Sequence, residues 1–203
     1  MSPFERNHYL NPLNTMEDKE MKDVPIFYCP KCGAKSFRQL SQKKFVCERE
    51  HCQFTAYKNA AAAVAAIIEL NDDKIILTRR GKEPDKGKLD LPGGFVDADE
   101  TLEKSLEREV KEELSLQIRD LSYLGSFPNK YPCEGLEYPT VDSVFVCKSD
   151  SINIKRDEGE IEGWEISDPG LLNLDDVAFK SIRKALERYL EFIQQRRNRK
   201  TKD

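Results

Sequence analysis

The sequence lacks any hydrophobic run long enough to cross a membrane. Its longest apolar segment is the nine-residue stretch 60–68, whereas a transmembrane helix needs about 20 mainly apolar residues. The first twelve residues, MSPFERNHYLNP, also lack the apolar centre of a secretory signal. These absences predict a cytoplasmic protein that does not associate with membranes.

An excess of positive charge is likewise missing. The 203 residues hold 33 Lys and Arg against 37 Asp and Glu, which gives a formal net charge of −4. This balance excludes a globally basic nucleic-acid binder but leaves room for a local basic patch. Ten Phe, seven Tyr and one Trp can form a hydrophobic core, so full disorder is excluded. The length fits one full domain and a small module.

The sequence has six cysteines, and four of them are clustered. They lie in CPKC and CEREHC, as Cys29, Cys32, Cys47 and Cys52, with a 14-residue loop between the two motifs. In a reducing compartment, clustered cysteines bind metal more often than they form disulfides. Two such motifs can place four thiolates around one tetrahedral Zn²⁺, and Gly33 allows the tight turn of the first. His51 is an alternative fourth ligand, and a module without metal is the third interpretation.

The predicted zinc ribbon is structural, because four protein ligands leave no open position on the metal. Residues 29–58 carry seven Lys or Arg against two Glu, a local net charge of +5. Zinc ribbons with such a balance can contact nucleic acid. Since the sequence does not interleave aromatic and basic residues as single-strand binders do, we favour a solvated face over a nucleic-acid surface.

Composition and periodicity divide the chain into four segments. We predict a flexible leader at 1–25, the zinc ribbon at 26–58, a main domain at 59–175, and an amphipathic helix with a basic tail at 176–203. Within the main domain, the pattern predicts a hairpin from 61–70 and 74–80, a loop at 81–94, a helix that begins near Thr101, strands at 115–127, 140–149 and 161–166, and a loop at 129–139. The last helix should cover 176–195.

The helix after Thr101 carries both a core stripe and an acidic cluster. The stripe recurs every four residues, at Leu102, Leu106, Val110 and Leu114. Glu109, Glu112 and Glu113 are three and four residues apart, so they share one face about a quarter turn from the stripe. Three like charges repel one another, whereas a bound Mg²⁺ or Mn²⁺ would hold them together, and Arg108 can brace the cluster. Taken alone, the glutamates favour a solvated acidic face.

The spacing around these glutamates resembles the Nudix box, the signature of the Nudix hydrolase family. The matching positions are Gly94, Glu100, Arg108, Glu109, Val110, Glu112, Glu113 and Leu116. One position departs from the signature, because Ser115 stands where the family has glycine. That glycine ends the helix, and serine at a positive φ would cost about 1 kcal/mol without removing a ligand. Activity is therefore still expected.

The resemblance implies a fold and a reaction. The implied fold is of the α/β class, an α/β/α sandwich around a mixed, curved sheet, preceded by the small zinc ribbon. The implied reaction is hydrolysis of the diphosphate in a nucleoside diphosphate that is linked to another moiety. Glu109, Glu112, Glu113 and the Gly94 carbonyl would hold Mg²⁺ or Mn²⁺, which would activate a water.

The resemblance also suggests a general base and a substrate-binding surface. The base is expected in the box or in the loop before Trp164, where Glu160 is preferred to Glu158 and Glu162. The region where family members bind the nucleobase is flanked here by Phe127, Tyr131 and Tyr138. An aromatic side chain in such a loop can stack on the base, and a core or lid role is the alternative.

The cysteine-rich ribbon before the main domain resembles the NADH pyrophosphatase-type group of the family. The chain lacks that group's SQPWPFPxS segment and has GSFPNKYPCEGLEYPTVD instead, which weakens the case for NADH. We predict a small nucleotide substrate such as ADP-ribose or NADH. The alternatives are removal of an NAD cap from RNA and a non-catalytic nucleotide sensor. Homodimers are common in the family, so a homodimer is a further expectation.

Overall fold

The structure is a computed structural model that describes residues 28–41, 43–133 and 136–200. It divides into two compact units, one that ends at Lys58 and one that begins at Asn59, and each is described by itself. The leader predicted at 1–25 lies outside the described residues, as do the last three residues of the predicted basic tail.

The first unit is a small antiparallel sheet with strand order β1-β2-β3. Its strands are β1 (Phe37–Gln39), β2 (Lys44–Cys47) and β3 (Thr55–Tyr57). Phe37 stacks on Phe45 and on Phe54, with ring centroids 5.8 and 6.3 Å apart, and Phe45 and Cys47 are buried. A core of this size is usually too small to hold a fold without a metal or disulfides.

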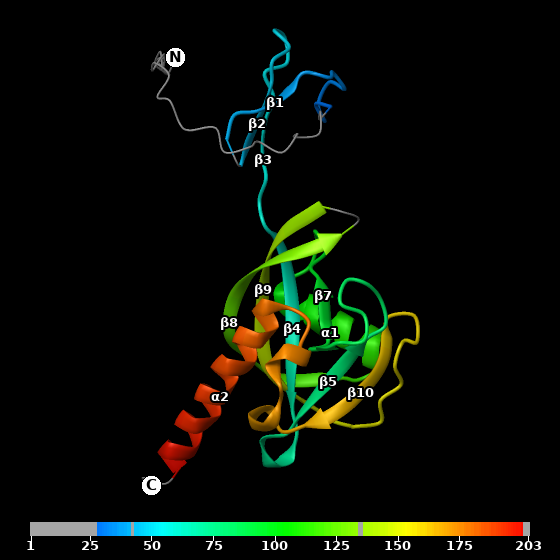
Figure 1. Ribbon diagram of the computed structural model, residues 1–203, viewed down its shortest axis with the longest axis vertical. Coiled ribbons are helices and arrows are strands. Elements are labelled where there is room, and N and C mark those ends of the chain that lie inside the picture. Colours follow the sequence, from blue (N-terminus) through cyan, green and yellow to red (C-terminus); the bar gives the residue numbers. More distant parts are fainter. Residues whose placement is uncertain (1–27, 42, 134–135, 201–203) are drawn as a thin grey trace. The chain divides into compact units, whose positions relative to one another are not determined.

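The second unit is built on a seven-stranded mixed sheet (Figure 1). Its main path runs β10-β5-β4-β9-β8, while β6 pairs with β5 and β7 pairs with β4. The strands are β4 (Ala61–Glu69), β5 (Ile75–Arg80), β6 (Leu89–Asp90), β7 (Gly93–Phe95), β8 (Ile118–Cys133), β9 (Leu136–Ser149) and β10 (Ile161–Ser167). The pairing of β4 with β9 is parallel, and the other named strand pairs are antiparallel.

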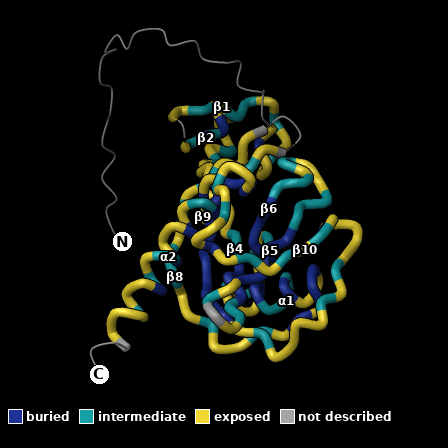
Figure 2. The backbone as a smooth tube through the Cα atoms, turned by 60° about the horizontal axis from the view of Figure 1, so that its bottom comes forward, coloured by how far each residue is buried: buried dark blue, intermediate teal, exposed yellow. Residues whose placement is uncertain are grey.

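The apolar run at 60–68 forms a strand because both faces of β4 are covered. Ala65 and Ile67 belong to one hydrophobic cluster, and Val64, Ala66 and Ile68 belong to another. Successive side chains of a strand point to opposite faces, so a strand between two covering layers needs apolar residues at every position. In Figure 2 the central strands carry the buried segments, and the surrounding loops are mostly exposed.

One helix covers each face of this sheet (Figure 1). Helix α1 (Leu102–Leu114) buries Leu106, Val110 and Leu114 in the cluster that contains Ile76 of β5. Helix α2 (Lys180–Lys200) buries the side chains of Ile182, Ala185, Leu186, Tyr189 and Ile193 in the opposite cluster. The predicted α/β/α sandwich around a mixed sheet is thus confirmed. Neither helix in the described residues has the length and hydropathy that a bilayer span requires.

The ends of α1 follow the sequence signals. Thr101 is the N-cap, and its side chain accepts a hydrogen bond from the backbone N–H of Lys104 at 3.3 Å. At the other end, Ser115 adopts the left-handed conformation with φ 56° and ψ 27°. The predicted helix start near Thr101 and the positive φ at Ser115 are therefore confirmed.

The prediction of a loop at 129–139 is wrong, because β8 and β9 form a long hairpin there. Lys130 pairs with Pro139 and Tyr131 pairs with Tyr138 in the antiparallel register. The segment is rich in proline, tyrosine and glutamate, and its prolines favour a loop in the local sequence. Pro128 and Pro132 are tolerated because β8 is an edge strand, where a missing N–H need not break a ladder hydrogen bond.

The last helix also differs from the prediction at both ends. It begins at Lys180 instead of residue 176, after short 3-10 turns at Pro169–Leu171 and Leu174–Asp176. It continues to Lys200 and includes the start of the predicted solvated tail. Arg196 forms ion pairs with Glu69 and Asp73, and Arg197 pairs with Asp73. Carboxylates at the end of β4 and in the turn after it thus pair with the last turns of the helix, beyond its predicted end.

Candidate active site

Two adjacent glycines allow α1 to lie close to β7. The backbone N–H of Gly93 donates a hydrogen bond to the Glu113 carboxylate at 3.0 Å. A Cβ on Gly94 would lie 2.5 Å from the carboxyl carbon of Glu109, and a Cβ on Gly93 would lie 2.1 Å from the carbonyl oxygen of Val64. No larger residue fits at either position without movement, so the glycines bring two glutamates against the sheet.

Burial raises the pKa values of both glutamates. The pKa of Glu113 lies well above its usual value, and that of Glu109 is raised more moderately. Glu113 is buried, and the Glu109 side chain is 14% exposed. Loss of solvation disfavours a carboxylate, whereas a nearby cation favours it. The pair is therefore suited to ionise when a cation binds beside it.

Arg108 holds the outer side of the acidic cluster. Its guanidinium donates two hydrogen bonds of 2.8 Å to the two carboxylate oxygens of Glu100. It also donates to Glu109 at 2.8 Å and to Glu112 at 3.1 Å. The bonds to Glu100 are the main reason that the pKa of Arg108 is raised. The predicted bracing role of Arg108 thus agrees with its contacts.

A cavity of about 380 Å³ opens beside these residues. Glu109, Glu113 and Gly94 line it, whereas Glu112 does not, and the Glu112 side chain is 59% exposed. The expected trio is therefore split into an inner pair and an outer member. Seven of the lining side chains are carboxylic acids, against three basic ones, Arg80, Lys82 and Arg108. The cavity is predominantly acidic.

A second polar group lines the cavity, and the sequence patterns did not single it out. Asp90 forms an ion pair with Arg80 at 2.8 Å and accepts a hydrogen bond from the Leu91 N–H at 2.9 Å. Burial raises the pKa of Asp90 to about 6 despite these partners. Asp142 is also buried and accepts a 2.7 Å hydrogen bond from the Thr140 hydroxyl. The acidic residue between two leucines in LDLPGG was the available signal.

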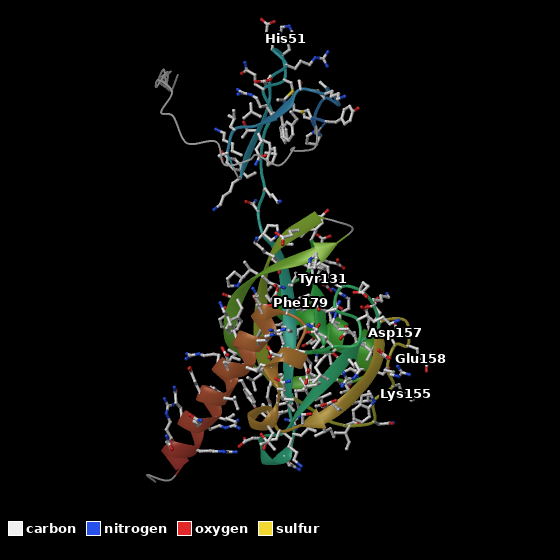
Figure 3. All side chains as sticks on the ribbon, in the orientation of Figure 1. His51, Tyr131, Lys155, Asp157, Glu158 and Phe179 are labelled. Carbon is white, nitrogen blue, oxygen red and sulfur yellow. The ribbon has the colours of Figure 1, made fainter. Side chains whose placement is uncertain are left out.

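Aromatic side chains from three distant segments meet in the cavity. Phe95 and Tyr131 form an edge contact with ring centroids 5.4 Å apart, and the ring centroids of Tyr131 and Phe179 are 5.6 Å apart. Tyr131 and Phe179 are labelled in Figure 3. The Arg80 guanidinium lies 4.8 Å from the centre of the Phe179 ring. Phe95 is 43% exposed, so part of this aromatic wall is free to contact a planar ligand.

One of the three predicted base-binding aromatics lines the cavity. Tyr131 does so, whereas Phe127 packs against the hydrophobic core and Tyr138 is 47% exposed outside the lining. The prediction followed position in the sequence and could not resolve which way each side chain of the hairpin points. Phe95 and Phe179 were missed because their segments are distant in the chain from the predicted loop.

The segment before Trp164 places one of the three candidate bases in the cavity. Glu160 lines the cavity and forms a 2.6 Å ion pair with Lys82. Glu158 is 84% exposed and, like Glu162, does not line the cavity; Figure 3 shows Glu158 beside Asp157 on this loop. Backbone hydrogen bonds from Lys155 and Asp157 to the last carbonyls of α1 hold the loop against that helix.

The cavity residues fit a hard divalent cation. Their donors are carboxylate oxygens, which Mg²⁺ and Mn²⁺ prefer, and the acidic excess would repel an anionic ligand unless cations intervened. Within the described residues, only the four cysteines form a group whose ligand atoms all lie within 4.8 Å of one another. Arg108 and Gly93 hold the glutamates instead, by the hydrogen bonds given above.

The four cysteines of the first unit fit a tetrahedral zinc ion. The Sγ atoms of Cys29 and Cys52 are 3.8 Å apart, and those of Cys32 and Cys47 are 3.7 Å apart. A tetrahedral site with Zn–S bonds of about 2.3 Å requires sulfur separations of about 3.8 Å. His51 is exposed and, within the described chain, is not part of this group. The geometry favours the four-cysteine interpretation over the alternative with histidine.

Known proteins resemble both the sequence and the fold. A family model described as NUDIX domain matches residues 59–193. An ADP-ribose pyrophosphatase of Methanocaldococcus jannaschii is 41% identical over 98 residues, covering 47% of this chain and 57% of that protein. An NAD-capped RNA hydrolase NudC of Photorhabdus laumondii is 30% identical over 134 residues, covering 66% of this chain and 48% of that protein. The chain spans about half the length of these relatives.

The solved structures that resemble this fold are more distant in sequence. A NUDIX hydrolase from Nitrosomonas europaea aligns with a TM-score of 0.64 at 24% identity, covering 81% of this chain and 90% of that chain. The NUDIX domain of Shewanella oneidensis NrtR, solved with ADP-ribose, aligns with a TM-score of 0.53 at 20% identity, covering 67% of this chain and 90% of that one. At 24% and 20% identity, these structures show a shared fold and nothing more.

Proposed function

This chain belongs to the Nudix family, and we propose that it is a pyrophosphohydrolase that cleaves the diphosphate of a nucleoside diphosphate linked to another moiety. One observation carries the proposal: the box glutamates Glu109 and Glu113 meet the Gly93–Gly94 turn in an acidic cavity of about 380 Å³. Retention of these carboxylates argues against a purely nucleotide-sensing role.

The cavity supports a nucleotide as the substrate. Its aromatic wall offers a surface on which a base can stack, and a buried Asp142 offers an acceptor for a hydroxyl or amino group. We propose ADP-ribose or a similar small dinucleotide, in line with the activity named for the archaeal relative. Removal of an NAD cap from RNA is the second candidate, which the names of the bacterial relatives and the basic first unit favour.

The proposed roles follow from where each side chain lies. Glu109 and Glu113 would hold Mg²⁺ or Mn²⁺ from inside the cavity, with Glu112 and the Gly94 carbonyl as further candidate ligands. The chemistry that a bound cation supplies is neutralisation of the diphosphate and activation of water. Arg108 keeps Glu109 in place, and Glu160 would accept the proton of the attacking water once a substrate displaces Lys82.

Three further expectations concern the zinc ion, the cellular compartment and the oligomeric state. We propose that Cys29, Cys32, Cys47 and Cys52 hold a structural Zn²⁺, since their spacing matches a tetrahedral set. The cytoplasm stays our expected compartment, and a homodimer stays a prediction.

The test is hydrolysis of a substrate panel with Mg²⁺, with Mn²⁺ and with chelator. The panel should hold ADP-ribose, NADH, NAD⁺, a nucleotide sugar and NAD-capped RNA. Glu109→Gln and Glu113→Gln should lose at least about 100-fold in kcat/KM, because changing even the outer partners of a metal ligand costs 10- to 100-fold. Glu107→Gln is the matched control, since Glu107 lies on the same helix and pairs with Lys104. Metal-independent turnover, or full activity in Glu113→Gln, would refute the proposal.

A further inference from the structure

Among the described residues of the first unit, the three strands leave one face of their sheet uncovered. Residues directly opposite each other in neighbouring strands point to the same face. The register pairs Arg38 with Val46, Val46 with Thr55, and Lys44 with Tyr57. These five residues therefore share one face, called the open face below. The other face carries the buried Phe45 and Cys47, so the open face is the solvent side of the sheet.

An aromatic ring and two cations are displayed on the open face. Tyr57 is 60% exposed, and the Arg38 side chain is 61% exposed. Lys44 lies directly opposite Tyr57. Along the sequence these residues are scattered, and strand pairing alone places a lysine opposite the ring. The order of residues in the sequence does not show this placement.

The charge of the first unit suits a polyanion. Residues 28–58 hold seven basic and two acidic side chains, whereas residues 59–203 hold 23 basic and 30 acidic ones. Within the described chain, Arg38 is the only one of the seven cations with a carboxylate within 4.0 Å, that of Glu48. An exposed pair of this kind contributes at most about 1 kcal/mol, so a phosphate can take the place of Glu48.

We propose that the open face binds single-stranded RNA, with a base stacked on Tyr57 and phosphates on Lys44 and Arg38. Three strands span about 10 Å, which leaves room for a short stretch of nucleotides. Unpaired RNA exposes its bases for stacking on aromatic rings, whereas a duplex hides them. A single exposed ring with a lysine opposite it, on a sheet face that also carries an arginine, is a poor match for an apolar protein partner or a bilayer. The inference does not depend on the proposed hydrolysis.

Fluorescence anisotropy with the zinc-loaded 203-residue chain tests this inference. The probe is a labelled oligouridine of about 12 nucleotides, a length within the range that such modules bind, measured without added Mg²⁺ or Mn²⁺ so that it stays intact. Tyr57→Ala should weaken binding about 5- to 150-fold, the range expected for one stacked base. Lys44→Gln should reduce the slope of log K against log salt by about 0.7.

Matched variants keep the result interpretable. Tyr123→Ala removes a tyrosine of similar exposure from the second unit, 57% exposed, and Lys74→Gln removes an exposed lysine there; both should bind RNA as the unmodified protein does. Tyr57→Leu keeps the bulk and strand compatibility of the side chain, so a loss in both Tyr57 variants with zinc content unchanged identifies stacking.

Three outcomes would overturn the inference. The first is unchanged binding in both Tyr57 variants. The second is equal or tighter binding of duplex RNA or poly-glutamate, which would indicate a general polyanion effect. The third is an equal loss in Tyr123→Ala. Hydrolysis of free ADP-ribose should be the same in the Tyr57 variants and the unmodified protein, so the outcome is separable from that of the hydrolase test.

Discussion

Alanine at Gly93 should lower the stability of the protein, whereas alanine at Gly94 should lower its activity with little change in stability. Gly93 has φ +152°, and a Cβ there would lie 2.1 Å from the carbonyl oxygen of Val64 and 2.8 Å from the Cα of Ala65. Both contacts are with the backbone of β4, which cannot move without disturbing its pairing with β9. A strained φ and an overpacked contact each cost about 1–3 kcal/mol. Gly93→Ala should therefore lose about 2–6 kcal/mol of unfolding free energy.

The neighbouring substitution meets a different obstacle. A Cβ on Gly94 would lie 2.5 Å from the Glu109 carboxyl carbon, which is the far end of a flexible side chain. Rotation of Glu109 relieves that contact, so Gly94→Ala should change the unfolding free energy by less than about 1 kcal/mol. The same rotation removes Glu109 from its place in the cavity. We expect kcat/KM for ADP-ribose to fall at least about 10-fold.

Thermal unfolding and hydrolysis, measured on the same preparations, check both halves of the prediction. A domain of this size loses about 2–4 °C in Tm per kcal/mol, so Gly93→Ala should unfold at least about 4 °C lower. Gly94→Ala should unfold less than about 4 °C from the unmodified protein. An active Gly94→Ala, or a Gly93→Ala with unchanged Tm, would refute the steric argument.

Three further predictions concern stability. Ser115→Gly should raise the unfolding free energy by about 0.5–1 kcal/mol in thermal unfolding, because Ser115 has φ 56°. Cys52→Ser should lower zinc content measured by atomic absorption and make the first unit sensitive to protease, since one of four ligands is lost. Asp73→Asn should destabilise the protein at pH 7 with unchanged hydrolysis: burial opposes the charge, but hydrogen bonds from Arg197 and Arg196 lower the pKa of Asp73. The stabilisation that a lowered pKa provides is fully present above the unfolded pKa of about 3.9 and is lost as the pH falls through the lower, folded pKa. In urea titrations, the difference in unfolding free energy between Asp73→Asn and the unmodified protein should therefore be smaller at pH 3 than at pH 7.

The layers of the second unit could be predicted because local pattern and burial agree there. The uninterrupted apolar run at 60–68 could be a strand only if both faces were covered, and two helices cover them. The hairpin at 129–139 could not be predicted in the same way. Whether Pro128 and Pro132 break a strand depends on whether that strand lies at the edge of the sheet, which is a property of topology and not of local sequence.

The residues of the candidate site also fall into a group that local sequence predicts and a group that only the fold brings together. Residues inside the box were found because their chemistry needs fixed spacing on one helix. Phe95, Asp142 and Phe179 were missed because the sheet brings them together from segments up to about eighty residues apart in the chain. The open face was missed for the same reason, since register alone places Lys44 opposite Tyr57.

The unequal burial of the three box glutamates follows from helix geometry. At about 100° per residue, the core stripe is centred on Val110, and Glu113, Glu109 and Glu112 lie about 60°, 100° and 160° from it. The observed exposure follows that order: Glu113 is buried, the Glu109 side chain is 14% exposed and the Glu112 side chain is 59% exposed. Treating the three as one face overlooked this gradient. Under the proposed function, a cation in the cavity would be held from inside by Glu113 and Glu109. Loss of activity should therefore be larger for Glu113→Gln than for Glu112→Gln.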